Sequence, residues 1–297
     1  MTMNKEKRIF ALGFFDGVHL GHQALLRRCV DLARQHSLQP AAITFDRHPQ
    51  SIFTQTPPPQ INTAADRVLL LKRFGMEQVI TLPVTREVMS TPWESFLDRL
   101  TEQGAAGFVC GQDFRFGHRG EGNAERLEIY CRQRNLPFEV LQDQTLDGIR
   151  ISSTHIRSLV ESGEMEAAVK FLGHPHILTG TVVTGQQLGR KIGIPTANLV
   201  INQGVLVPKF GVYACKILTE TGEFMAVTNV GTRPTVAGNG ITVEPWILDF
   251  NGDLYGKTVT LQFCKFLRSE KKFPTLADLQ AEIRKNAEEV RNFFEKY

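Results

Sequence analysis

The sequence has no hydrophobic run that approaches the roughly 20 residues of a membrane-spanning helix. It also has no CxxC pair. Its five cysteines are odd in number and scattered along the chain, which argues against a disulfide framework and favours reduced thiols in a cytoplasmic protein. The apolar stretch that begins at Ile9 ends at Asp16, too early for a secretory signal peptide. We therefore expect a cytoplasmic protein that does not bind a membrane.

A strong charge of either sign is missing as well. The 34 Lys and Arg residues and the 31 Asp and Glu residues leave a net charge of +3, so no basic field predicts nucleic acid as a partner. What the chain does have is 42% hydrophobic residues over a length of 297. This is enough apolar material for two packed cores, and the length suggests about two domains.

Short apolar segments alternate with segments of helical periodicity in the first half of the chain. We predict strands at residues 9–13, 41–45, 79–82 and 108–110, and helices at 21–35, at 63–74, between 91 and 104, and at 125–134. Such alternation favours a parallel sheet that is covered by helices on both faces.

The pattern changes near residue 173, where Gly173, His174 and Pro175 interrupt a helical stretch. Thr275 is placed to cap a final helix whose apolar stripe reaches Phe294. Between these points we predict strands at 178–183, 212–217, 224–230, 241–250 and 258–266, separated by glycine-containing turns, which indicate an antiparallel sheet or small barrel. The chain is therefore expected to form one domain at 1–173 and a second at 174–297.

Two histidines, His19 and His22, lie three residues apart at the start of the first predicted helix. A helix N-terminus offers unpaired N–H groups and the positive end of the helix dipole, which favour phosphate. Gly21 allows a ligand to approach the backbone closely, and we assign Gly17 to the same site. The alternative is a loop histidine followed by a helix-capping one. We favour a polyphosphate site because the motif lies between a strand and a helix.

Two further segments of the first half carry candidate ligand-binding residues. Ser153 and Thr154 precede Arg157 by about one helical turn, which suits a phosphate clamp, although either hydroxyl could instead cap the helix. Asp113 and Phe114 follow the strand predicted at 108–110 and suit a flat ring with polar edges. An ordinary loop whose aromatic residues join the local core is the alternative for this second segment.

Together these three segments resemble the N-terminal module of the bacterial bifunctional riboflavin kinase/FAD synthetase family. The resemblance continues in the same order through residues 189–199, which contain Pro-Thr-Ala-Asn, then 229–235, the segment around Glu244, and 267–273, so it covers nearly the whole chain. It implies a Rossmann-like α/β nucleotidyltransferase domain followed by an antiparallel β-barrel flavokinase domain with a C-terminal helix.

The resemblance also implies the chemistry and the partners, which are riboflavin, FMN and ATP. The second domain would phosphorylate riboflavin to FMN, and the first would adenylylate FMN to FAD and release pyrophosphate. The implied roles are Glu244 as general base; Thr196 and Asn198 as ligands of Mg²⁺; Gly189 and Lys191 as contacts to the ATP phosphates; Asp113, Phe114 and Arg268 as flavin contacts; His19, His22 and Arg157 as charge stabilisers in adenylyl transfer; and Ser153 and Thr154 as triphosphate contacts.

Three other functions stay open at the level of the sequence. One module could be an inactive scaffold, the chain could be a flavin-binding regulator without turnover, or it could adenylylate another small phosphate ester. The simultaneous presence of the histidine pair, Arg157, Thr196, Asn198 and Glu244 argues against a regulator, because binding alone would not need them. We expect a monomer or a weak homo-oligomer.

Overall fold

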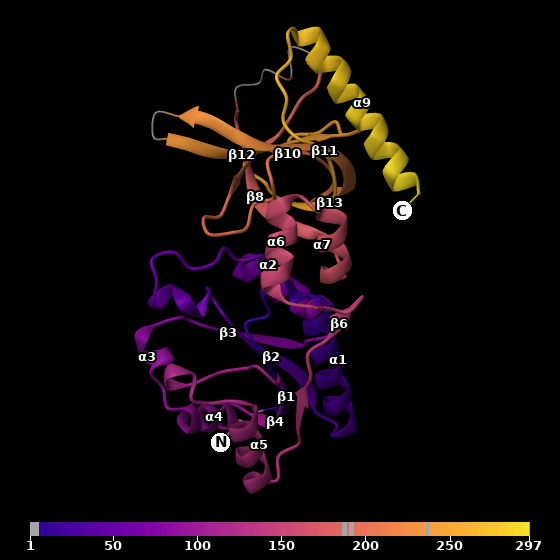
Figure 1. Cartoon of the computed structure of the whole chain (residues 1–297). Coiled ribbons are helices and arrows are strands. Elements are labelled where there is room, and N and C mark those ends of the chain that lie inside the picture. Colours follow the sequence, from indigo (N-terminus) through magenta and orange to yellow (C-terminus); the bar gives the residue numbers. More distant parts are fainter. Residues whose placement is uncertain (1–5, 186–188, 190–192, 236–237, 297) are drawn as a thin grey trace. The chain divides into compact units, whose positions relative to one another are not determined.

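The chain folds into two compact units, Met1–Ser153 and Thr154–Tyr297, in a computed structural model that describes residues 6–185, 189, 193–235 and 238–296 (Figure 1). The first unit thus ends before the division that the sequence predicts after residue 173. The difference lies in helices α6 (Ser153–Ser162) and α7 (Met165–Leu172), because α7 packs on strands of the second unit. None of the described helices is both long and apolar enough to cross a membrane.

A five-stranded parallel sheet forms the centre of the first unit, with the strand order β3-β2-β1-β4-β5. The predicted parallel sheet is therefore confirmed. Its edge strand β5 consists of four partly buried residues, too short a segment for periodicity to reveal. The strands are β1 (Arg8–Leu12), β2 (Gln39–Phe45), β3 (Gln78–Leu82), β4 (Ala105–Gly111) and β5 (Phe138–Leu141).

Helices cover both faces of this sheet, as the alternating pattern predicts. The face that carries Phe10 and Leu12 packs against two helices, α4 and α5. Helix α1 lies on the opposite face, where the Cys29 thiol donates to the Ile9 carbonyl. The helices are α1 (Leu20–Gln35), α2 (Ala64–Arg73), α3 (Arg86–Met89), α4 (Trp93–Glu102) and α5 (Ala124–Arg134), joined by the short turns η1 (Asp16–Val18), η2 (Pro49–Ile52) and η3 (His118–Gly120) and by the hairpin of β6 (Thr145–Leu146) and β7 (Ile149–Arg150).

The second unit is a closed antiparallel barrel with the strand order β10-β11-β12-β9-β8-β13. The predicted barrel is confirmed. Strand β9 closes it between β12 and β8, but its four residues carry no pattern that predicts a strand. The strands are β8 (His176–Val183), β9 (Asn198–Ile201), β10 (Gly211–Thr219), β11 (Gly222–Thr235), β12 (Gly238–Ile247) and β13 (Thr258–Arg268).

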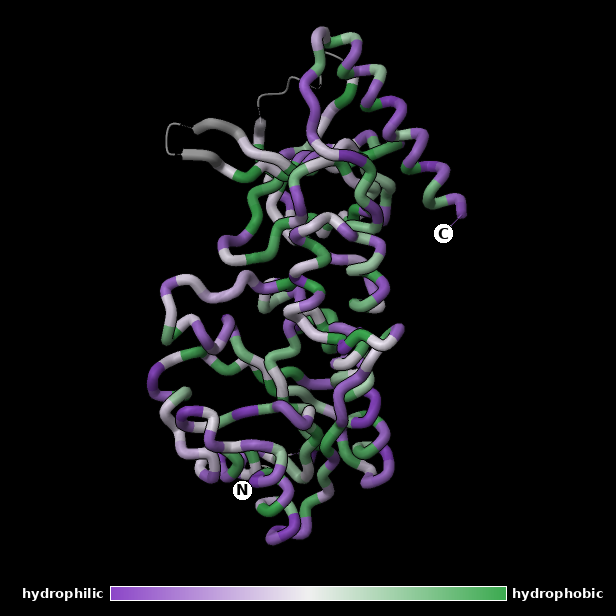
Figure 2. Tube along the Cα trace, viewed as in Figure 1, coloured by the Kyte–Doolittle hydropathy of each residue, from purple (hydrophilic) through white to green (hydrophobic). Residues whose placement is uncertain are grey.

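Helix α9 (Leu276–Glu295) packs against the barrel and ends the described chain. It begins where the sequence predicts, since the Thr275 hydroxyl accepts a hydrogen bond from the Asp278 amide at 3.1 Å. Its buried residues Ala287 and Val290 join the cluster that contains Val212 of β10. The alternation of hydrophilic and hydrophobic residues along this helix is visible in Figure 2, and it leaves one apolar stripe for the barrel.

Candidate active sites

The two histidines of the first unit form one stacked pair at the start of α1. Their ring centroids lie 3.6 Å apart and the ring planes differ by 12°. His19 is the N-cap residue, and its Nδ1 accepts a hydrogen bond from the His22 amide at 3.2 Å. The structure therefore does contain a helix-capping histidine, but it is the first of the two and not the second. Because a neutral imidazole that accepts at Nδ1 carries its proton on Nε2, His19 is a donor at Nε2.

The environment of His22 keeps its ring neutral. Burial lowers its pKa well below the ordinary value, and the positive charges of a protonated His19 and of Arg67 would lower that pKa further. Its Nδ1 atom is buried and has no hydrogen-bond partner among the residues that the structure describes. A Cβ on Gly21 would lie 3.3 Å from the His19 ring, so the glycine permits this tight arrangement.

The turn that leads into the histidines is strained. Phe15 has a φ of 57°, Gly17 of 82° and Val18 of 40°, which is the left-handed region that a β-branched residue such as Val18 rarely adopts. Such backbone persists only where its surroundings hold it, and it concentrates at functional sites. The positive φ of Gly17 therefore gives a physical reason for a glycine at this position of the candidate site.

Side chains from several elements hold this turn through its carbonyl groups. The Phe14 carbonyl accepts from Thr44 Oγ1 at 2.7 Å and from Arg67 Nη1 at 3.2 Å. The Val18 carbonyl accepts from Gln23 Nε2 at 2.9 Å. These bonds fix the entry of α1 and hence the position of both imidazoles.

Ser153 takes part in the same bracing. Its hydroxyl donates to the Asp16 carbonyl at 2.8 Å, while the Asp16 carboxylate accepts from the Ile61 amide at 2.9 Å. A serine has a single O–H donor, so in this arrangement it does not donate to a phosphate. Thr154 and Arg157 lie in the first turn of α6 and belong to the second unit, so their approach to the histidines stays a prediction.

The residues predicted to contact the flavin lie after β4. The Asp113 carboxylate accepts from Arg150 Nη2 at 2.8 Å, and both side chains are largely exposed. Phe114 stacks on Phe116 with ring centroids 5.6 Å apart, and it packs against the core of the unit. In the structure these aromatic residues do join the local core, as the alternative interpretation expects. Flavin contact by Asp113 and Phe114 stays a prediction.

The candidate residues of the second unit form one row across the barrel strands. Glu244 of β12 lies opposite Asn229 of β11, and Asn229 lies opposite Val212 of β10. Val212 in turn lies opposite Arg268 of β13. Directly opposed residues place their side chains on the same face of a sheet, so the register brings Glu244 and Arg268 to one surface.

The predicted metal ligands extend this row on its other side. Leu199 of β9 pairs with Val243, so in an antiparallel register the preceding residue Asn198 lies opposite Glu244. Thr196 forms a bridge to β12 two residues beyond Glu244. Hydroxyl and amide oxygens are hard ligands suited to Mg²⁺ together with ATP phosphates, and their place beside Glu244 fits that ion.

A cavity of about 460 Å³ lies against this row. Its opposite wall is the first half of α9, and its walls are mostly apolar, which suits a flat aromatic ring. Gly189 contributes to it, whereas Lys191 lies outside the described residues. The lining residues are Gly189, Ile194, Thr196, Val212, Val227, Asn229, Glu244, Trp246, Arg268, Glu270, Lys271, Phe273, Leu276, Leu279, Ile283 and Asn286.

Arg268 is tied to α9 at the edge of this cavity. Its Nε donates to Asn286 Oδ1 at 3.1 Å and lies 3.2 Å from the Glu282 carboxylate. Lys271 reaches the same carboxylate at 2.7 Å. The edge of the cavity therefore carries two cations that are held in place by the helix.

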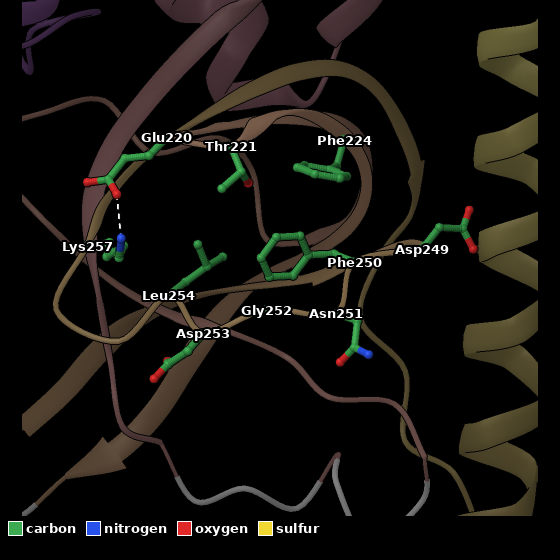
Figure 3. Close-up of a pocket in the computed structure, with 10 residues that line it drawn as sticks. All are labelled: Glu220, Thr221, Phe224, Asp249, Phe250, Asn251, Gly252, Asp253, Leu254 and Lys257. Atoms are coloured by element: carbon green, nitrogen blue, oxygen red, sulfur yellow. Dashed lines mark hydrogen bonds and ion pairs between the residues drawn. The ribbon is translucent and has the colours of Figure 1, made fainter.

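A second cavity of the barrel unit, about 390 Å³ in volume, is lined by none of the candidate residues. Figure 3 shows Phe224, Phe250 and Leu254 facing it, with the ion pair of Lys257 and Glu220 at one side. It is formed by the turns around β10–β11 and after β12.

For two residues of the candidate sites, Arg67 and Asn229, the sequence motifs predict no role. Arg67 does have a signal in the helical pattern, because it precedes the buried Leu70 and Leu71 by three and four residues and so falls on the apolar stripe of α2. Asn229 lies in the motif at 229–235, but no local signal places it at the site. It faces Glu244 only because of the register between β11 and β12.

Comparisons with known proteins agree with this architecture. The FAD synthetase family model matches residues 1–155, and the riboflavin kinase family model matches residues 172–294. A relative from Listeria monocytogenes, named bifunctional riboflavin kinase/FMN adenylyltransferase, is 34% identical over 97% of this chain and 93% of its own length. A relative of the same name from Escherichia coli is 34% identical over 98% of this chain and 94% of its own length.

A solved structure has the same fold over both units. The crystal structure described as a macrolide-efflux protein from Streptococcus pneumoniae covers 98% of this chain and 95% of its own, with a TM-score of 0.88 and 31% identity. Two family models in series and relatives that match over nearly their whole length decide the assignment. The chain belongs to the family of bifunctional riboflavin kinase/FMN adenylyltransferases.

Proposed function

We propose that the two ATP-dependent reactions of this enzyme, riboflavin to FMN and FMN to FAD, have separate sites, with the histidine pair in one and the row around Glu244 in the other. The observation that carries the proposal is that each unit holds its own cluster of polar groups on rigid elements, the histidine pair in the first and the row around Glu244 in the second. We place the functional division after residue 173, so that Arg157 serves adenylyl transfer.

In the second unit, Glu244 accepts the proton of the terminal ribityl hydroxyl of riboflavin. The hydroxyl oxygen forms a bond to the γ-phosphorus of ATP, the bond from that phosphorus to the bridging oxygen breaks, and ADP leaves. Thr196 and Asn198 hold Mg²⁺, which neutralises phosphate charge when bound. Phosphoryl transfer depends mainly on positioning and charge neutralisation. Arg268 orients the flavin, and Gly189 and Lys191 contact the ATP phosphates.

In the domain that we place at residues 1–173, a phosphate oxygen of FMN attacks the α-phosphorus of ATP. The bond from this phosphorus to the β-phosphate breaks, and pyrophosphate leaves without a covalent enzyme intermediate. His19 and His22 donate hydrogen bonds to oxygens on which charge develops. Gly17 and Gly21 let the phosphates approach the backbone, Thr154 and Arg157 hold the triphosphate, and Asp113 and Phe114 contact the flavin.

We further propose that the enzyme works in the cytoplasm as a monomer or a weak homo-oligomer, without nucleic acid or membrane partners. One assay tests the function directly. Purified protein is incubated with riboflavin, ATP and Mg²⁺, and the flavins are separated over time. FMN is expected first and FAD afterwards, with one pyrophosphate released per FAD. Bound riboflavin without turnover would contradict the proposal and support a regulator. FMN without FAD would show that one module is a scaffold.

A further inference from the structure

Two polar side chains of the cavity beside Glu244, those of Asn229 and Glu270, take no part in the proposed phosphoryl transfer. Both line the cavity. Asn229 is a half-buried residue of β11, and Glu270 belongs to the exposed segment that follows β13. Neither side chain makes a hydrogen bond or an ion pair with a residue that the structure describes. A few polar groups on an otherwise apolar wall are what fixes the orientation of a bound ligand.

Gly231 brings these two groups together. It lies two residues beyond Asn229 on β11, so both residues face the same side of the sheet. A Cβ on Gly231 would lie 2.2 Å from Glu270 Oε1 and 3.5 Å from Asn229 Nδ2. The missing side chain therefore leaves the space in which the Glu270 carboxylate rests on the strand beside the Asn229 amide. An amide that donates and accepts thus lies next to a carboxylate that accepts.

The order of residues along the row decides which substrate lies on which side of Glu244. The proposed metal ligands Thr196 and Asn198 lie on one side of Glu244, so the ATP phosphates belong there. Asn229 lies on the other side, directly opposite Glu244 on the neighbouring strand. The flavin therefore approaches Glu244 across Asn229.

The spacing of the strands decides which part of the flavin meets the pair. Neighbouring strands are about 4.8 Å apart. When the terminal ribityl hydroxyl lies at Glu244, the secondary hydroxyls on the adjoining carbons fall within one such spacing, beside Asn229. Hydroxyls both donate and accept hydrogen bonds, which suits an amide next to a carboxylate. The flat ring instead suits the apolar wall of α9 around Leu279 and Ile283.

We propose that Asn229 and Glu270 are specificity-determining residues of riboflavin phosphorylation, which bind the secondary hydroxyls of the ribityl chain. The inference rests on the proposed role of Glu244 as the base. It goes further because it names the part of the substrate that this site recognises. A flavin without these hydroxyls would leave both polar groups unpaired when it fills the cavity, and a site built to bind a hydroxyl rejects such an analogue strongly.

The first test compares two substrates of the unmodified protein. The second substrate is an analogue in which an unbranched hydroxypentyl chain replaces the ribityl chain, so the terminal hydroxyl stays and the secondary hydroxyls are absent. Phosphorylated flavins are separated by chromatography, and kcat/KM is measured at saturating ATP and Mg²⁺. Riboflavin is expected to be preferred at least about 10²-fold. Equal values of kcat/KM for the two flavins would overturn the inference.

Three substitutions test whether the pair causes this preference. Asn229→Ala and Glu270→Ala each remove one group, and Gly231→Ala displaces the Glu270 carboxylate through the added Cβ. Each is expected to lower kcat/KM for riboflavin at least about tenfold and to leave that for the analogue within about threefold. Asn251→Ala and Glu288→Ala, at exposed positions of the same unit, are the matched controls and should keep the full preference.

Two further measurements separate substrate recognition from other causes. The midpoint of denaturant unfolding verifies that each variant is folded, and the KM for ATP is expected to stay within about twofold. A loss that is equal for the two flavins would overturn the inference and make the pair a support of Glu244. A tenfold rise in the KM for ATP with an unchanged preference for riboflavin would also overturn it and assign the pair to the nucleotide.

The inference stays testable if Asn229→Ala does not fold. Glu270→Ala and Gly231→Ala then decide, because they change an exposed side chain and a position without a side chain. An unchanged preference for riboflavin in both of these variants would overturn the inference. Riboflavin phosphorylation at the full rate by Glu244→Gln would instead contradict the proposed function.

Discussion

Glu244 and Asn229 lie directly opposite each other on neighbouring strands of the barrel, β12 and β11. The same register extends to Arg268 in one direction and to Asn198 in the other. A proposed base, a metal ligand and a cation are thus held at fixed spacing by backbone pairing rather than by loops. Sites built on strands keep their geometry better than sites on loops, so each substitution in this row is expected to have a local effect.

The first prediction concerns Glu244→Gln. The amide keeps the size of the side chain but cannot accept the hydroxyl proton, so FMN formation is expected to fall by about 10²- to 10⁴-fold. FAD formation from supplied FMN should stay within about twofold, because the histidine pair is untouched. The two products are measured separately by chromatography. Glu288→Gln on the exposed side of α9 is the control, and an equal loss of both activities in a folded Glu244→Gln would contradict separate sites.

The second prediction is the mirror experiment, His22→Ala. Removal of one hydrogen-bond donor to a developing charge typically costs about 10²- to 10³-fold in rate, so FAD formation should nearly stop. FMN formation from riboflavin should continue. His36→Ala, at the exposed end of the same helix, should change neither activity. FAD formation within about threefold of the unmodified rate in His22→Ala would refute the assignment.

Local pattern predicted much of the fold and part of the sites. The strand before His19 and the helix after it follow from apolar periodicity and glycine placement, which depend on nearby residues alone. The positive φ of Val18 could not be predicted, because the turn around it is held by hydrogen bonds from residues remote in the sequence, such as those from Ser153 to Asp16 and from Thr44 to Phe14. Tertiary contacts override local preference at such a position.

The sequence predicted which residues belong to the site around Glu244, but it did not predict how they are arranged across the strands. Which residue lies opposite Glu244 depends on register between segments that are separated by many residues, and a shift by one position would turn every side chain to the other face. Strand β9, which brings Asn198 to Glu244, is too short to show a period. The burial of Arg67 is visible only once α2 is packed on its turn.

The third prediction separates two roles of Ser153. The hydrogen bond from its hydroxyl to the Asp16 carbonyl predicts that Ser153→Ala lowers the free energy of unfolding by about 1 kcal/mol and slows FAD formation through a looser turn. The KM for ATP should change less than about threefold, since the hydroxyl is not a donor to phosphate. Ser158→Ala on the exposed side of α6 is the control. A rise of tenfold or more in this KM with unchanged stability would contradict the bracing role and support Ser153 as a contact to the ATP triphosphate.

The fourth prediction concerns the pH dependence of barrel stability. His176 on β8 has an exposed fraction of 0%. Burial lowers its pKa to about 4, a change that the hydrogen bond to the Leu206 carbonyl opposes and His174 reinforces. Between this pKa and the unfolded value of about 6.5, the unfolded chain binds more protons than the folded one, so stability falls as the pH falls. The loss attributable to His176 is expected to be about 2 kcal/mol at pH 5, and it is expected to level off below about pH 3.

Denaturant unfolding of the full chain, followed by Trp246 fluorescence in a Trp93→Phe background so that the signal comes from the barrel, measures this dependence. In His176→Gln, whose amide can still donate to Leu206 but does not titrate, the difference in unfolding free energy between pH 7.5 and pH 5 should shrink by about the same 2 kcal/mol. His36→Gln removes an exposed histidine and should leave the difference unchanged. If His176→Gln and the unmodified protein lose equal stability over this range, the acid sensitivity of the barrel does not come from this buried imidazole.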